Sequence, residues 1–300
     1  MSNKNYPTIP VAAIDAIDAI DAIDEDHKIK ADKHLGAIAP AVLDENGRLC
    51  GFVHSVETGA AVDGPGVRFA LFTSGCQFRC LYCHNPDTWK LRNGELRTVD
   101  SVVEEIGKYA KFLKFAGGVT FTGGEPMMQA HFIGEVIYRL KQQYGLHITI
   151  DTQGFLSPHL EDAWFDNIDL ILLDIKHINP EQHVALTAQP LQPTLDFAER
   201  MIRLKKKMWI RYVLVPGWSD NLADVEKHAT YVKHLADLGE EIAVGQNLIE
   251  RVEVLPFHNM GVTKWKEIAQ EYLLADTPAP TPELTEEVRN IYRVKGLTAV

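Results

Sequence analysis

The chain has 300 residues, 46% of them hydrophobic, which is enough apolar material for a substantial core in one large domain or two medium ones. The formal net charge is −11 and no long basic run occurs, so we expect no nucleic-acid partner. Because no run of about 18 apolar residues appears and the first residues lack the pattern of a signal peptide, we expect no membrane span and a cytoplasmic location.

Residues 1–50 differ in pattern from the rest of the chain. The triplet Ala-Ile-Asp is repeated without interruption through residues 13–24. A period of three fits neither the alternation of a strand nor a stable stripe on a helix. We therefore expect an acidic, weakly structured N-terminal extension over residues 1–50, with an acidic docking helix as the alternative, and one domain over residues 51–300.

Within the domain, short β-rich runs alternate with helical patterns. The runs span residues 67–74, 118–123, 147–152, 169–176, 209–215 and 251–258. The helical patterns lie near residues 98–113, 129–144, 194–207 and 221–238, after residues 157 and 180, and at 282–293. Most runs are apolar on both faces, which indicates parallel strands covered by helices and an α/β fold. Since a closed barrel needs eight strands, we expect an open, partial (β/α)6 barrel of TIM type, with a doubly wound sheet as the alternative.

Polar residues stand at the carboxyl ends of these predicted strands, where the chemistry of α/β barrels collects. A single polar residue at such a place is often a helix cap or an ion-pair partner. A succession of them indicates one functional rim. The residues concerned are Glu125, Asp151, Thr152, Asp174, Lys176, Arg211 and His258.

The loop after the first predicted strand carries Cys76, Cys80 and Cys83 in a C-x3-C-x2-C pattern. Thiolates favour zinc or iron–sulfur clusters. A structural zinc site would need Cys50 or His84 as its fourth ligand. A cubane cluster held by three cysteines would instead keep one iron open, as a reaction site requires. We expect Cys50 to be a small buried apolar side chain.

This loop, with Tyr82 before its last cysteine and Gly-Gly-Glu-Pro at residues 123–126, resembles the signature of the radical S-adenosylmethionine (SAM) enzymes. The resemblance implies a [4Fe–4S] cluster on the three cysteines, with the amino and carboxylate groups of SAM on the open iron. From about Gly51 to the C-terminus the chain also resembles the glycyl-radical-enzyme activases, although Gln153 replaces an asparagine of that family. The stretches that carry this likeness are AVDGPGVRF (61–69), DTQGF (151–155), LLDIKH (172–177), WIRYVLVPGWSD (209–220), LPFHNMG (255–261) and Lys264-Trp265.

Because residues 84–122 contain no cysteine, the chain lacks the ferredoxin-like insert of related activases, which favours the compact pyruvate formate-lyase type. The resemblance implies an oxidoreductase of anaerobic glucose metabolism. Reduced flavodoxin or ferredoxin would supply an electron, SAM would be cleaved to methionine and a 5′-deoxyadenosyl radical, and this radical would remove a glycine Cα hydrogen from pyruvate formate-lyase. The alternatives are a radical SAM enzyme with another glycyl-radical enzyme or substrate, and a non-catalytic zinc- or cluster-binding module.

The resemblance also implies residue roles, none of them a side-chain general acid or base, since the cluster and SAM carry the chemistry. The implied SAM contacts are Tyr82, Cys83, His84, Gly123, Gly124, Glu125, Asp174, Ile175, Lys176 and His258. Asp151, Thr152 and Asp174 match positions that can hold a monovalent cation; an ion pair with Lys176 is the alternative. Asp63 and Arg211 match positions near the protein substrate and the active centre, with a turn and a buried ion pair as their alternatives.

Overall fold

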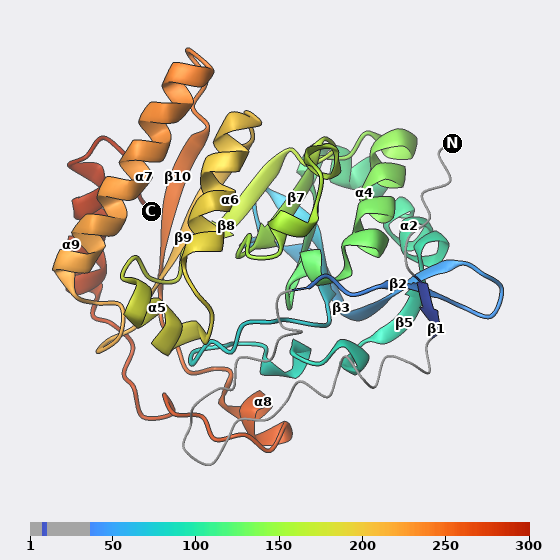
Figure 1. Ribbon diagram of the computed structural model, residues 1–300, viewed down its shortest axis with the longest axis horizontal. Coiled ribbons are helices and arrows are strands. Elements are labelled where there is room, and N and C mark those ends of the chain that lie inside the picture. Colours follow the sequence, from blue (N-terminus) through green and yellow to red (C-terminus); the bar gives the residue numbers. More distant parts are fainter. Residues whose placement is uncertain (1–7, 11–36) are drawn as a thin grey trace. The chain divides into compact units, whose positions relative to one another are not determined.

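The computed structural model describes residues 8–10 and 37–300 (Figure 1). The chain divides into two compact units. Of the described residues, the first unit comprises 8–10 and 37–77, Thr88–Asp151 and His159–Ile168. The second comprises Phe78–Asp87, Thr152–Pro158 and Asp169–Val300. The Ala-Ile-Asp repeat lies outside the described residues, so the weak structure expected of it stays a prediction.

The sheet of the first unit has the strand order β1-β2-β3-β4-β6-β7, and β5 pairs with β3. Strands β4, β6 and β7 are parallel, whereas β3 runs antiparallel to β2, β4 and β5. The strands are β1 (Thr8–Pro10), β2 (Ala41–Leu43), β3 (Leu49–Ala60), β4 (Val67–Thr73), β5 (Glu95–Thr98), β6 (Gly117–Gly123) and β7 (Ile148–Thr152).

Helices α2 (Val99–Gly107), α3 (Ala110–Ala116) and α4 (Ala130–Tyr144) belong to the same unit, and α2 and α4 lie side by side (Figure 1). Capping residues in the sequence define the start of α2 and the end of α4. The Thr98 hydroxyl accepts a hydrogen bond from the Ser101 N–H at the start of α2, and Gly145, with φ +62°, ends α4. The apolar face of α4 is buried, with Ile133, Val136 and Leu140 all fully inaccessible.

The second unit contains three parallel strands in the order β8 (Leu170–Asp174), β9 (Lys207–Leu214) and β10 (Ile249–Pro256). The helices that follow them in the chain are α5 (Pro180–Thr187), α6 (Gln192–Arg203), α7 (Leu222–Ile242), α8 (Val262–Glu267) and α9 (Pro282–Arg293). The side chains of Asn179 and Asn221 cap α5 and α7 by accepting backbone N–H groups of the first turn.

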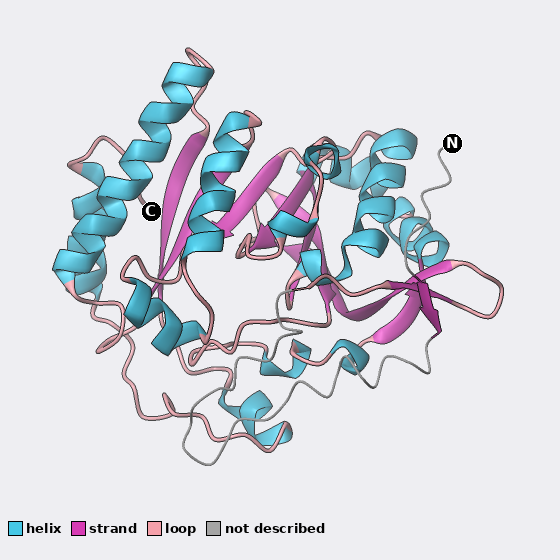
Figure 2. Ribbon diagram, in the orientation of Figure 1, coloured by secondary structure: helices cyan, strands magenta, loops and turns pink. Residues whose placement is uncertain are grey.

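The predicted α/β fold class with mostly parallel strands is confirmed, and strands and helices alternate along the chain (Figure 2). All six predicted strands are present, as β4, β6, β7, β8, β9 and β10. The helix predicted at 98–113 is two helices, α2 and α3, because the chain turns at residues 108–109. Strands β1, β2, β3 and β5 and helix α8 were not predicted. Among the described residues, no helix combines the length and the apolar character needed to cross a membrane.

The expected boundary at residue 50 falls inside a packed region. Residues 41–43 pair with β3, Ala41 and Val42 are buried, and the Ala39 N–H donates to the Met128 carbonyl at 2.7 Å. Residues 37–50 are thus packed into the first unit, and β1 (Thr8–Pro10) pairs with β2. The division of the chain at residue 50 stays a prediction.

Candidate active site

The first cysteine, Cys76, lies three residues after the end of β4 and is buried in the first unit. Its N–H donates to the Trp89 carbonyl at 3.2 Å, and the N–H of Gly75 donates to the Thr88 carbonyl at 2.7 Å. The Gly75 carbonyl in turn accepts the N–H of Glu125 at 2.8 Å. The backbone therefore ties the start of the cysteine loop to the Gly-Gly-Glu turn that ends β6.

The Gly-Gly-Glu turn requires glycine at both of its first positions. Gly123 has φ +109°, and a Cβ on Gly124 would lie 2.3 Å from the Gly75 carbonyl oxygen. Glu125 is fully buried, and its Oε1 accepts the Met127 N–H at 3.0 Å. The carboxylate thus caps the short 3-10 helix Pro126–Gln129, and the two glycines leave backbone exposed where a side chain would otherwise stand.

Cys80 and Cys83 belong to the second unit, where the end of α5 holds their loop. The N–H groups of Arg79 and Leu81 donate to the carbonyls of Thr187 and Leu186 at 2.9 and 3.0 Å. The Cys83 N–H donates to the Cys80 carbonyl at 3.0 Å, which closes a turn between the two cysteines.

Helix α8 holds the other side of this loop. The indole N–H of Trp265 donates to the Cys83 carbonyl at 2.9 Å, and the Lys264 ammonium donates to the side-chain oxygen of Asn85 at 2.7 Å. A Cβ on Gly261 would lie 3.2 Å from the carbonyls of both Cys83 and His84. Lys264 and Trp265 belong to the family likeness seen in the sequence, but no local pattern indicates a role for either residue.

The three loop cysteines have the donor chemistry of an iron–sulfur site, since none of them forms a disulfide. Among the described residues, no set of three or more His, Cys, Asp or Glu side chains forms a ready-made metal site, so the gathering of these cysteines around one cluster stays a prediction. Cys50 is different. It lies in β3, 3% exposed, and its thiol donates to the Arg48 carbonyl.

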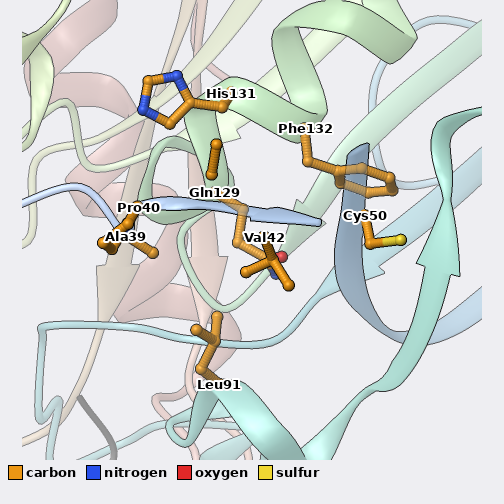
Figure 3. A pocket seen from close by; sticks show the side chains of 9 residues that line it. Ala39, Pro40, Val42, Cys50, Leu91, Gln129, His131 and Phe132 are labelled. Atoms are coloured by element: carbon orange, nitrogen blue, oxygen red, sulfur yellow. The ribbon is translucent and has the colours of Figure 1, made fainter. Parts of the chain in front are cut away.

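Figure 3 shows Cys50 beside Phe132 in a small, mainly apolar pocket. The pocket is lined by Ala39, Pro40, Ala41, Val42, Cys50, Leu91, Gln129, His131 and Phe132. Burial raises the pKa of the Cys50 thiol, which disfavours the thiolate that a metal ligand needs. The expectation that Cys50 is a small buried apolar side chain is confirmed.

A buried ion pair stands at the end of β8. The Lys176 ammonium lies 2.7 Å from Oδ2 of Asp174 and 5.5 Å from the centroid of the Tyr82 ring. Burial opposes the charge of Lys176, but the Asp174 carboxylate outweighs this effect, and the pKa of Lys176 is raised well above its usual value. Lys176 is therefore a fixed positive charge. Between these two residues, the backbone N–H of Ile175 donates to the Arg211 carbonyl at 3.2 Å.

Two further groups of the second unit suit a bound nucleoside. The Tyr82 hydroxyl is buried and has no hydrogen-bond partner within the described part of the chain. His84 and His258 pack edge to face, with ring centroids 4.6 Å apart. Burial lowers the pKa of His84, with smaller contributions from the charges of His258 and Lys264, so its ring is held neutral.

The remaining predicted residues have well-defined partners. Arg211 is buried and bonds through Nε to Glu253 at 3.0 Å, the ion pair named above as its alternative role. In the first unit, Oδ2 of Asp151 accepts the Thr122 hydroxyl at 2.8 Å, and the Asp63 carbonyl accepts the Thr120 hydroxyl at 2.6 Å. The predicted cation ligands are shared between the units, since Thr152 and Asp174 belong to the second, and the cation site stays a prediction.

Comparisons with known proteins agree with the likeness seen in the sequence. The model of the radical SAM superfamily matches residues 70–232. A pyruvate formate-lyase-activating enzyme from Staphylococcus aureus (strain USA300) is 40% identical over 257 residues, which cover 83% of this chain and 97% of the relative.

Two solved structures resemble the chain at low sequence identity. A radical SAM methyltransferase from Sphaerobacter thermophilus has a TM-score of 0.55 at 15% identity, covering 87% of this chain and 75% of its own. SuiB from Streptococcus suis, bound to its precursor peptide SuiA, has a TM-score of 0.52 at 16% identity, covering 77% and 46%. These likenesses show the fold alone, and they confirm the expected TIM-like α/β class.

Proposed function

We propose that this chain, which belongs to the radical SAM superfamily and within it to the family of pyruvate formate-lyase-activating enzymes, installs a glycyl radical on pyruvate formate-lyase. The observation that carries the proposal is the 40% identity to such an enzyme over 97% of that relative's length. When bound, a [4Fe–4S] cluster and SAM supply the radical chemistry, in which one electron splits SAM into methionine and a 5′-deoxyadenosyl radical that takes a glycine Cα hydrogen.

Cys76, Cys80 and Cys83 would hold the cluster. Their loop is supported by backbone hydrogen bonds within each unit, and α5 and α8 fix the part with Cys80 and Cys83. Three thiolate ligands would leave one iron of such a cluster open to the amino and carboxylate groups of SAM. The chain's contribution is to position the reactants and to exclude water and oxygen, since the cofactor carries the chemistry.

The SAM contacts would divide by chemical type. Gly123 and Gly124 expose backbone carbonyls that suit the methionine ammonium, close to the buried Glu125. The fixed charge of Lys176 suits the methionine carboxylate, and its partner Asp174 suits a ribose hydroxyl. The groups that would border the nucleoside are the Tyr82 hydroxyl, the backbone of Cys83 and Ile175, and the rings of His84 and His258.

Other residues would act beside SAM. Asp151, Thr152 and Asp174 offer oxygen ligands for a monovalent cation. Arg211 would stay an interior cation paired with Glu253, next to the backbone of Ile175. Asp63 would contact the protein substrate. The electron donor would be a flavodoxin or a ferredoxin, and we expect the enzyme to work in the cytoplasm.

The test is anaerobic reconstitution with iron and sulfide, followed by SAM, a reductant and pyruvate formate-lyase. Electron paramagnetic resonance should then show a glycyl radical on pyruvate formate-lyase, with 5′-deoxyadenosine formed alongside it. A pyruvate formate-lyase variant with alanine at its radical glycine is the matched control and should give no such signal. Formation of 5′-deoxyadenosine without any glycyl signal would show that the chain acts on another substrate. Colourless protein that contains zinc but no iron would refute the proposal that the chain is a radical SAM enzyme.

A further inference from the structure

Arg68, the second residue of β4, is fully buried and is bonded on several sides. Its Nε donates to the Thr120 hydroxyl at 2.6 Å, and one terminal nitrogen donates to the Thr149 hydroxyl at 2.9 Å. The guanidinium also donates to the carbonyls of Gly117 and Val119. Burying a charge is costly unless hydrogen bonds compensate it. The charge of Arg68 is compensated by its hydrogen bonds to residues of β6 and β7.

The same guanidinium holds the turn that precedes β4. Its other terminal nitrogen donates to the Pro65 carbonyl at 3.0 Å, and the Thr120 hydroxyl donates to the Asp63 carbonyl at 2.6 Å. Between these two anchors, Gly64 has φ +122°, and a Cβ there would lie 3.1 Å from Cδ of Arg68. The Asp63–Pro65 turn is therefore fastened to the sheet at both ends and packed on the arginine stem.

The sheet face on which the turn lies also carries predicted active-site residues, further along the strands. Register pairs Thr120 with Ala70 and with Thr149, so these residues stand at one level of the sheet. Because side chains alternate along a strand, Thr122 lies on the same face as Thr120, two residues or about 7 Å further along β6. The Thr122 hydroxyl bonds to Asp151, and the Gly-Gly-Glu turn begins at the next residue of β6.

We infer that Arg68 and Thr120 are positioning residues that fix the Asp63–Pro65 turn on this face, so that Asp63 meets the glycine-bearing loop of the protein substrate. The inference rests on the proposed function and deepens it. A fixed turn matters because removal of one Cα hydrogen depends on close placement of the reacting atoms. Neither residue touches the cluster or SAM in this account; each acts through the turn.

The test compares Thr120→Val with the matched control Thr149→Val in reconstituted enzyme. Both variants remove one hydroxyl bonded to Arg68, but only Thr120 also bonds to the turn. In Thr120→Val we expect hydrogen exchange at residues 62–66 to rise about tenfold, the factor for one lost hydrogen bond, and glycyl-radical formation to slow by a similar factor. Formation of 5′-deoxyadenosine without protein substrate should stay at the wild-type rate. Thr149→Val should resemble wild type in all three measurements.

Arg68→Lys keeps the charge but loses the planar guanidinium that bonds to Thr120 and Pro65 together. Exchange at the turn should therefore rise and glycyl-radical formation should slow, while 5′-deoxyadenosine formation stays at the wild-type rate. The inference would be overturned if both threonine variants had equal effects. It would also be overturned if melting temperature, cluster content and 5′-deoxyadenosine formation fell in parallel, because Arg68 and Thr120 would then have only a structural role. Unchanged exchange at the turn in Thr120→Val would overturn it as well. If wild-type enzyme formed no glycyl radical, the proposed function would fail on its own, and the exchange comparison would still decide whether these residues fix the turn.

Discussion

Single residues of the site act chiefly through backbone approach and fixed charge. The clearest case is Gly124, whose missing side chain allows the Gly75 carbonyl to come within van der Waals distance. Lys176 is the clearest fixed charge, since Asp174 keeps it protonated in a buried place. The close backbone approach at Gly124 and the charge of Lys176 are thus both in place without a ligand, as a preformed SAM site would need.

Gly124→Ala should weaken SAM binding because the new Cβ would push the Gly-Gly-Glu turn away from the cysteine loop. Overpacking of this kind costs about 1–3 kcal/mol, so we expect roughly tenfold to hundredfold weaker binding. Equilibrium binding of SAM to reconstituted enzyme measures it. Gly59→Ala is the control, because a Cβ at Gly59 meets no atom within 4 Å. Wild-type affinity in Gly124→Ala would show that the close approach has no part in binding.

At this scale the sequence names candidate residues, but it does not show how each of them is paired. The cysteine spacing and the Gly-Gly-Glu turn are local features, so the chain itself carries them. The partners of Arg211 and Asp174 are different, because a strand-end charge can face either a ligand or another side chain. The structure shows ion pairs at both, with Glu253 and Lys176. No local pattern shows the partners of Arg68, which come from β6, β7 and the turn before β4.

At the scale of elements, α8 supports the loop that carries Cys80 and Cys83. Trp265→Phe removes the indole N–H that donates to the Cys83 carbonyl while keeping most of the ring packing. One lost hydrogen bond of this kind costs about 1 kcal/mol, so the cluster should lose iron to a chelator several times faster. Absorbance of the cluster against time measures the loss.

Trp209→Phe is the matched control for this variant. It removes a comparable indole hydrogen bond, to Glu250 at 2.8 Å, on strand β9. Its cluster should be lost at the wild-type rate. Equal rates of iron loss in both tryptophan variants would show that α8 gives the cysteine loop no particular support.

The packing of α7 on α9 and β9 should make stability depend on pH. His228 is fully buried between Tyr212 and Tyr292, and burial lowers its pKa to about 3. The unfolded chain binds a proton at this residue below about pH 6.5 and the folded chain does not, so stability is lost as pH falls from 6.5 toward 3. The loss is at most about 1.4 kcal/mol per pH unit.

His228→Gln, which keeps a polar side chain near the Tyr292 hydroxyl, should flatten this dependence between pH 7 and 5. Denaturant unfolding at each pH measures the free energy of unfolding. His234→Gln is the control, since His234 lies exposed on the same helix. A pH slope that is the same in wild type and His228→Gln would contradict the assignment, and the buried His183, with a pKa of about 4, would be the next residue to test.

The elements that sequence reasoning found and missed differ in how they are stabilised. Strands β4, β6, β7, β8 and β9 are mostly buried on both faces, so their composition alone marks them, whereas β10 alternates buried and half-buried residues. Strand β3 mixes buried and exposed residues and contains Gly51 and Gly59, and it forms because β2, β4 and β5 pair with it. Helix α8 has only six residues and depends on its contacts with the cysteine loop. Pairing and contact between distant segments cannot be read from a local pattern.

At the scale of the whole molecule, the predicted site residues are distributed over both compact units. Cys76 and the Gly-Gly-Glu turn belong to the first unit, and Cys80, Cys83 and the Asp174–Lys176 pair belong to the second. The division falls within the cysteine loop itself, between Gln77 and Phe78.

Truncation tests where the folded part of the chain begins. A chain lacking residues 1–36 should keep its cluster and its melting temperature within a few degrees, because Ala39, Ala41 and Val42 remain to pack in the first unit. A chain lacking residues 1–50 loses these residues and strand β2, and should melt roughly 5 °C lower. Thermal unfolding of both proteins measures the difference. Equal melting temperatures would place the start of the folded domain at residue 51.

The most direct test concerns the fourth iron of the predicted cluster. Electron–nuclear double resonance of the reduced enzyme, with SAM labelled with ¹⁵N in its amino group, reports whether that nitrogen is bonded to the cluster. The account predicts a clear ¹⁵N coupling, which disappears when unlabelled SAM is used. A cluster of normal iron content that shows no such coupling, with its fourth iron held by a side chain of the protein, would contradict it.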